Sequence, residues 1–211
     1  MGRMLSGSAH LRSTVQLSHR IQAAWAKFHI HRHIFVDKAV SVYARLKLFQ
    51  SVTSPTILFG LSEIPLMRSQ VKQLDTLQRR MLRRVVGWIR SPAESWSDTM
   101  RRMNTRLEHA LPVFPMEPWS VQLARQQFRL AHRVAQASDG WPARIIKWCP
   151  WETNPQAGRG RGRPKLRWDD CLSSVTADIF GSRNWLHVFE HLPRSQIQEY
   201  EDKYVFFFAS T

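Results

Sequence analysis

Acidic residues, cysteines and long apolar runs are all scarce in this 211-residue chain. It holds 16 Asp and Glu against 31 Lys and Arg, which gives a formal net charge of +15 and a pI of about 11.1. So one-sided a charge predicts a polyanionic partner and says little about fold. With only two cysteines, no disulfide framework is expected. No apolar run approaches the roughly 20 residues of a membrane-spanning helix, so we expect no membrane partner.

Two alternatives for the charge stay open at this level. An anionic membrane surface is also a polyanion, and residues 1–20 loosely fit an Arg- and Ser-rich transit peptide that is poor in acids.

The hydrophobic content of 43% is enough for a packed core and exceeds that of a disordered chain. The sequence therefore predicts a folded basic protein, and it leaves nuclear and cytoplasmic localisation equally open.

Apolar residues at helical spacing dominate the first half of the chain and predict a mainly α fold. Asp37 is expected to cap one helix, Pro55 to begin another that stops at Gly60, and Gly87 to end a long helix from about residue 68. Lys38, Arg45 and Lys47 are expected to point away from the apolar stripe of their helix. The expected buried positions are Ala24, Trp25, Phe28 and Phe35, then Ala39, Val42, Tyr43, Leu46 and Phe49, then Leu74, Leu77, Met81 and Val85.

The second half predicts further helices separated by breaks. Ser91, followed by Pro92 and by Glu94 three positions on, is typical of a capping box and predicts a helix start. Further helices are expected over residues 120–137, 169–179 and 195–204. Residues 152–165, rich in Gly, Pro and Arg, read as a linker, and no alternating strand pattern is present.

Basic side chains gather opposite the expected buried stripe of the long helix. At 100° per residue they share one side, where cations can follow phosphates while the stripe holds the helix on its bundle. A solvated helix surface is the alternative, although such surfaces usually mix both signs and only Asp75 balances this one. The predicted nucleic-acid-binding residues of this helix are Lys72, Arg79, Arg80, Arg83 and Arg84.

A second basic segment, residues 159–167, overlaps the linker. Its glycines leave the backbone free, and its arginines offer forked donors to phosphates or flat faces to bases. A plain soluble linker is the alternative, and a phosphate-cradling loop is excluded because the Gly-Lys-Ser/Thr ending is missing. The predicted binding residues of this arm are Arg159, Arg161, Arg163, Lys165 and Arg167.

Neither catalytic nor metal-binding residues are predicted. Asp169 and Asp170 resemble a polymerase metal pair, but they follow the basic linker and open a helix, where acids suit the helix dipole. His187 and His191 could share zinc with Cys149 and Cys171, yet the cysteines lie far apart in sequence. Several tryptophans near the arm, Trp141, Trp148, Trp151 and Trp168, are expected to pack between helices, with base stacking as the alternative.

Several segments resemble those of one protein family, and they occur in the same order along the chain as in that family. They are Met1-Gly2-Arg3-Met4-Leu5, residues 20–28, the stretch 45–88 that contains Leu77-Gln78-Arg79-Arg80-Met81-Leu82-Arg83-Arg84, residues 95–104, and Gly162-Arg163-Pro164-Lys165-Leu166-Arg167-Trp168-Asp169-Asp170. Together they resemble the thumb and C-terminal region of reverse transcriptases from non-LTR (LINE-type) retrotransposons. Fingers, the palm with its aspartates, an endonuclease domain and a Cys/His knuckle have no counterpart in the sequence.

The resemblance implies an organisation and a function. Residues 1–14 would be the end of the palm, 15–90 a thumb-like bundle, 91–151 a post-thumb region, 152–167 the basic linker and 168–211 short C-terminal helices. The chain would grip RNA, DNA or RNA–DNA duplex through phosphates, with no cofactor and no catalysis of its own. Mg²⁺ is expected only for the full-length polymerase.

Two other functions stay open. The start at Met1 is where the palm would end, which suggests a truncated copy or a fragment of a longer reading frame. A degenerate relic without selected activity is the first alternative, and a basic helical partner-binding protein is the second.

Overall fold

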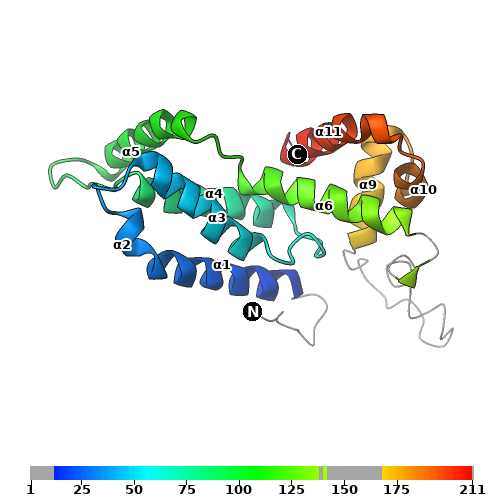
Figure 1. Cartoon of the computed structure of the whole chain (residues 1–211), viewed down its shortest axis with the longest axis horizontal. Coiled ribbons are helices and arrows are strands. Elements are labelled where there is room, and N and C mark those ends of the chain that lie inside the picture. Colours follow the sequence, from blue (N-terminus) through cyan, green and yellow to red (C-terminus); the bar gives the residue numbers. More distant parts are fainter. Residues whose placement is uncertain (1–11, 138–139, 142–167, 211) are drawn as a thin grey trace. The chain divides into compact units, whose positions relative to one another are not determined.

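The computed structural model describes residues 12–137, 140–141 and 168–210, and their regular structure is helical (Figure 1). None of these residues lies in a strand, so the predicted mainly α fold is confirmed. No helix among them has the length and apolar character needed to cross a membrane. The elements are α1 (Arg12–Ile30), α2 (Arg32–Phe35), α3 (Val42–Leu58), α4 (Arg68–Val85), α5 (Trp96–Ala110), η1 (Leu111–Val113), α6 (Trp119–Gln136), α9 (Trp168–Phe180), α10 (Trp185–Glu190), η3 (Arg194–Gln196) and α11 (Ile197–Ser210).

Contacts divide the chain into two compact units. Among described residues, unit 1 contains Thr14–Leu61 and Met67–Ser120, and unit 2 contains residues 12–13, Ser62–Leu66 and everything described from Val121 onward. The division falls in the first turn of α6, whereas the family resemblance placed segment boundaries after residues 90 and 151. Helix α5 therefore belongs with α1 to α4.

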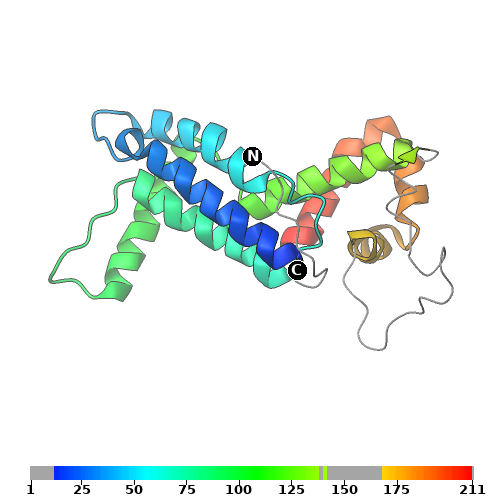
Figure 2. The ribbon, with the colours of Figure 1, turned by 90° about the horizontal axis from the view of Figure 1, so that it is seen from below.

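Unit 1 is built on three long helices, α1, α3 and α4, that lie side by side (Figures 1 and 2). Helix α4 buries one stripe because its apolar residues recur every three or four positions. All four positions predicted for this stripe, Leu74, Leu77, Met81 and Val85, are buried. From α1 and α3 come Ala24, Phe28, Leu46 and Phe49, also buried as predicted. Short α2 adds Phe35, whose ring stacks on Phe28 at 4.9 Å between centroids.

Arg45 was predicted to point away from the buried stripe of its helix, but the structure buries it. Its side chain is buried, and Nη1 donates to the backbone oxygens of Val85, at 2.5 Å, and Phe35, at 3.4 Å. The Val85 carbonyl is one of the last in α4, where helices lack internal donors and favour a cation. Burial, and then repulsion from Arg106, lowers the pKa of Arg45 from its usual value. Arg45 thus closes the end of α4 and is unavailable to a ligand.

Three predicted helix starts are also wrong. Ser41, not Asp37, caps α3 by accepting from the Ala44 N–H, which leaves Ala39 outside the helix and Tyr43 exposed. Pro55 does not restart the chain but lies inside α3. The helix continues through Pro55 because Ile57 and Leu58 beyond it are buried, which offsets the lost hydrogen bond.

The third misplaced start concerns α5. Ser95, rather than Ser91, is its N-cap and accepts from the Asp98 N–H at 3.2 Å. Glu94 does not complete a capping box; its carboxylate instead binds Arg102 and Thr99 further along the helix. The two predicted glycine stops are confirmed, because Gly60 has φ of 71° and Gly87 has φ of 97°, conformations that L side chains rarely adopt.

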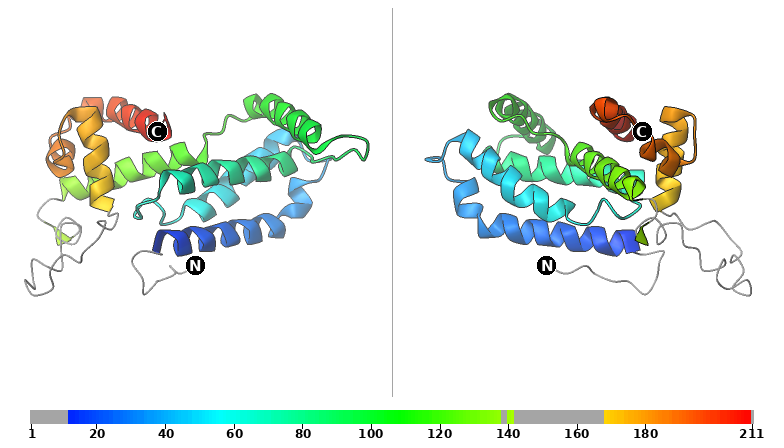
Figure 3. Two further views of the ribbon diagram at one scale, coloured as in Figure 1. Left: turned by 180° about the vertical axis from the view of Figure 1, so that it is seen from behind. Right: turned by 45° about the vertical axis from the view of Figure 1, so that its right-hand side comes forward.

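Unit 2 contains α6, α9, α10 and α11 (Figure 3). Its buried core is rich in aromatic side chains. Phe128 lies edge-on to Phe189, at 5.1 Å, and to Tyr204, at 5.7 Å. Glu201 is buried beside this core and forms ion pairs with Arg129, at 3.0 Å, and Arg125, at 3.5 Å. These arginines of α6 are used inside the unit, so they add less to a ligand-binding surface than their number suggests.

Candidate nucleic-acid interface

The five cations predicted on α4 all lie off its buried stripe. Lys72, Arg79 and Arg80 are exposed, while Arg83 and Arg84 are half-buried. The structure therefore brings these predicted site residues together on one helix, as the 100° spacing indicated. They do not form one uniform row, however. In the last two turns of α4, a side chain of α1 contacts two of the arginines on one side, and a side chain of α5 contacts a third on the other side.

On one flank, Arg80 and Arg84 lie over the ring of Trp25 from α1. The guanidinium carbons are 5.6 Å and 4.9 Å from the ring centroid, within the range of cation–π attraction. Trp25 is half-buried and also stacks on His29, at 5.8 Å. The tryptophan therefore holds two cations in place without neutralising their charge.

On the other flank, Arg83 points toward α5 and donates to the side-chain oxygen of Asn104 at 3.0 Å. This partner is neutral as well. Burial lowers the pKa of Arg83, and repulsion from Arg79 and then Arg80 adds to the effect. For Arg84 the pKa is lowered by burial and then by repulsion from Arg80 and Arg32. The arginines repel one another, which is the electrostatic state that a bound polyanion relieves.

Asp75, the one acid within α4, does not offset this charge locally. Its two carboxylate oxygens accept from the Ser120 N–H at 2.8 Å and from the Ser120 hydroxyl at 2.6 Å. Asp75 thereby satisfies a donor at the start of α6. Among the described residues, none of the five predicted α4 cations has an acidic partner within ion-pair distance.

A pair of tryptophans beside this helix was missed by the sequence reasoning. Trp88 and Trp96 lie 5.8 Å apart between ring centroids, Trp96 is 59% exposed, and Arg90 lies 5.9 Å from its ring. The segment between them is tied to α5, because Arg102 donates to the Ile89 backbone oxygen and pairs with Glu94. Only the tertiary structure shows that Trp88 is half-buried and Trp96 exposed. The pair offers flat apolar faces beside cations, which suits unpaired bases.

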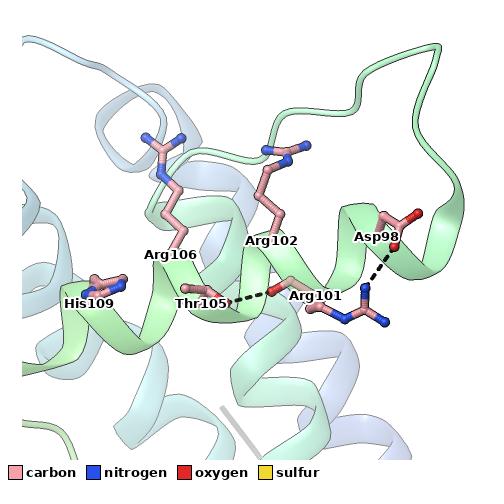
Figure 4. Close-up of a pocket in the computed structure, with 6 residues that line it drawn as sticks. All are labelled: Asp98, Arg101, Arg102, Thr105, Arg106 and His109. Atoms are coloured by element: carbon pink, nitrogen blue, oxygen red, sulfur yellow. Dashed lines mark hydrogen bonds and ion pairs between the residues drawn. The ribbon is translucent and has the colours of Figure 1, made fainter.

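Helix α5 adds a shallow basic hollow of about 520 Å³ (Figure 4). Arg101 is neutralised there by Asp98, at 2.9 Å. Arg106 has neither a hydrogen bond nor an ion pair among the described residues, and its Nη2 lies 3.3 Å from where a Cβ on Gly87 would stand. The hollow therefore contributes a cation next to the end of α4. Its lining residues are Asp98, Arg101, Arg102, Thr105, Arg106 and His109.

The predicted arm lies outside the described residues. Nothing is therefore said of the surroundings of its five cations, Arg159, Arg161, Arg163, Lys165 and Arg167. Of the tryptophans near it, Trp168 begins α9, is half-buried and donates from Nε1 to the Ser62 backbone oxygen at 2.7 Å. For Trp168 the packing interpretation holds. For Trp141 it is wrong, because that side chain is 76% exposed.

Asp169 and Asp170 lie in the first turn of α9, where the sequence placed a helix start. The Asp169 carboxylate accepts from Nε1 of Trp185 at 2.5 Å, which ties α9 to α10. Cys171 is half-buried, and burial, followed by repulsion from Asp170, raises the pKa of its thiol to about 11. A thiol held protonated in this way is a poor metal ligand.

No protein-family model, curated protein or solved structure matches this chain. The inference of function therefore rests on the residues and contacts described above.

Proposed function

We propose that this chain is a nucleic-acid-binding helical module, similar to the thumb region of a LINE-type reverse transcriptase, that grips phosphates without performing chemistry. The observation that supports the proposal best is the group of α4 cations without acidic partners, two of which rest on Trp25. RNA, single-stranded DNA and RNA–DNA duplex all present the required row of phosphates.

The physical basis is counterion release. Each phosphate neutralised by Lys or Arg frees a condensed cation, so binding weakens as salt rises, by about 0.7 to 0.9 log units per phosphate for each log unit of salt. Backbone contacts of this type carry no sequence information, so little sequence preference is expected. Exposed Trp96, with half-buried Trp88 beside it, adds surface that bases of any sequence can stack on.

The direct test is a salt titration of binding to labelled RNA, single-stranded DNA and RNA–DNA duplex, followed by fluorescence anisotropy. If α4 and the arm each engage about three phosphates, raising salt from 50 to 200 mM should weaken binding on the order of a thousandfold. An affinity independent of salt would contradict phosphate gripping. If the chain binds none of the three nucleic acids, the relic or the partner-binding alternative is favoured.

We also expect the purified chain to make no DNA on a primed RNA template with Mg²⁺ or Mn²⁺. Two-metal catalysis needs carboxylates that hold two ions about 3.5 to 4 Å apart, and the carboxylate of Asp169 accepts a hydrogen bond from Trp185. Incorporation of labelled nucleotide measures this. Synthesis that disappears in Asp169→Ala or Asp170→Ala would contradict the expectation and identify the pair as catalytic.

A further inference from the structure

The short helix α10 in unit 2 carries a group of metal-ligating side chains on its solvent side. His187, Glu190 and His191 are all exposed, and each offers a ligand atom within 4.8 Å of the other two. Positions i, i+3 and i+4 share one face of an α-helix, which is why they meet. The two imidazole centroids are 4.2 Å apart.

We propose that His187, Glu190 and His191 form a Zn²⁺ site on the surface of unit 2. Imidazole nitrogens and a carboxylate oxygen are ordinary zinc ligands, at about 2.0 to 2.2 Å from the metal. Tetrahedral ligands at that distance lie roughly 3.4 Å from one another. Rotations of exposed side chains are enough to bring the three atoms together around an ion.

A second observation supports the site. Nδ1 of His191 lies 2.9 Å from the His187 backbone oxygen. Histidines that bind metals commonly donate their other ring N–H to a backbone carbonyl, which fixes the ring orientation and the tautomer. With Nδ1 engaged in this way, Nε2 of His191 is the nitrogen left for a metal.

The spacing His-x-x-Glu-His, from His187 to His191, is also one that a class of zinc hydrolases uses on a helix. In zinc hydrolase motifs two histidines four positions apart bind the metal and the glutamate serves as the general base, whereas here Glu190 would be the third ligand. Among the described residues no further His, Cys, Asp or Glu joins the group, which leaves a fourth position for water. We assign this site zinc binding and the stabilisation of unit 2, and no reaction.

Zinc should stabilise unit 2 because α10 is short, and a short helix is only weakly stable by itself. Its apolar side packs on the core, and a metal would hold its other side in the helical conformation. Trp185, Leu186 and Phe189 are buried against the core of the unit. Bridging His187 to His191 across one turn favours the helical conformation that this packing needs. An ion that binds only the folded state raises stability in proportion to the logarithm of its concentration above Kd.

The test uses the full chain and ZnCl₂, with affinity measured by competition against a chromophoric chelator. We expect His187→Gln and His191→Gln each to weaken zinc binding on the order of tenfold to a hundredfold. His109→Gln is the matched control, because His109 is also exposed and helical but belongs to no such group, and it should bind as the wild type does.

Thermal unfolding followed by circular dichroism is the second readout. Zinc should raise the midpoint of the wild type and of His109→Gln, and leave the double variant His187→Gln/His191→Gln unchanged. Both histidines are exposed, so the variants should fold, and their helical spectra without zinc check this. Absence of zinc binding, or binding that survives the double substitution, overturns the proposal. Neither result bears on nucleic-acid binding, because the site does not depend on it.

Discussion

Replacing the four arginines at the end of α4 with glutamine should flatten the salt dependence of nucleic-acid binding. If they account for about three of six phosphate contacts, the slope falls by about 2.7 log units per log unit of salt. Raising salt from 50 to 200 mM would then weaken binding on the order of fortyfold instead of a thousandfold. The four are Arg79, Arg80, Arg83 and Arg84.

Helicity should be unchanged in this variant, because glutamine is also a good helix former. The cost to stability is the lost attraction to Trp25, about 0.5 to 1 kcal/mol for each exposed cation–π pair. Circular dichroism checks the fold, and anisotropy at four or more salt concentrations gives the slope.

A control with the same loss of charge separates local contact from net charge. Four exposed cations of unit 2 should be replaced with glutamine, namely Arg133, Arg183, Arg194 and Lys203. If contact at α4 decides binding, this control keeps most of the wild-type slope. Equal slopes in the two variants would mean that the α4 arginines are an ordinary solvated surface. A separate variant of Arg159, Arg161 and Arg163 should flatten the slope further and independently.

Met81→Asp should unfold unit 1. Met81 is fully buried in the middle of the α4 stripe. A charge placed there without a partner costs several kcal/mol. That is a large part of the roughly 5 to 15 kcal/mol that stabilises a small domain. Loss of helical signal at 222 nm at room temperature, or a much lower unfolding midpoint, measures the effect.

Gln73→Asp is the matched control, because it places the same side chain at an exposed position of the same helix. It should change the free energy of unfolding by less than about 1 kcal/mol, since only helix propensity is affected. If Met81→Asp melts like Gln73→Asp, the α4 stripe does not hold unit 1 together.

Local periodicity was enough to predict part of this fold. In α4, apolar and charged residues alternate at helical spacing over five turns, and only a helix fits this pattern. The buried residues of the α4 stripe were therefore predicted correctly. Gly60 and Gly87 ended helices as expected, because positive φ is a local requirement. Where a signal depended on neighbours in space, prediction failed: Arg45 reads as a surface residue until the end of α4 is placed against it.

The candidate sites divide in the same way. The five α4 cations could be found from sequence, because their common side follows from helix geometry alone. Their separation into a Trp25 flank and an Asn104 flank could not, since each partner comes from another helix. Nothing in the local sequence indicates that Trp96 stays exposed beside Trp88. His187 and His191 were considered as zinc ligands with the cysteines, whereas the structure joins them to Glu190.

By itself, the sequence determined the helical class, the strong positive charge and the side of α4 that carries it, because composition and 3.6-residue periodicity are properties of the chain alone. The tertiary structure decided which cations remain for a ligand. Arg45 caps α4, Arg125 and Arg129 pair with buried Glu201, and the arginines at the end of α4 keep only neutral partners. The reason is that neutralising a charge needs an acid within about 4 Å, and packing alone brings distant residues that close.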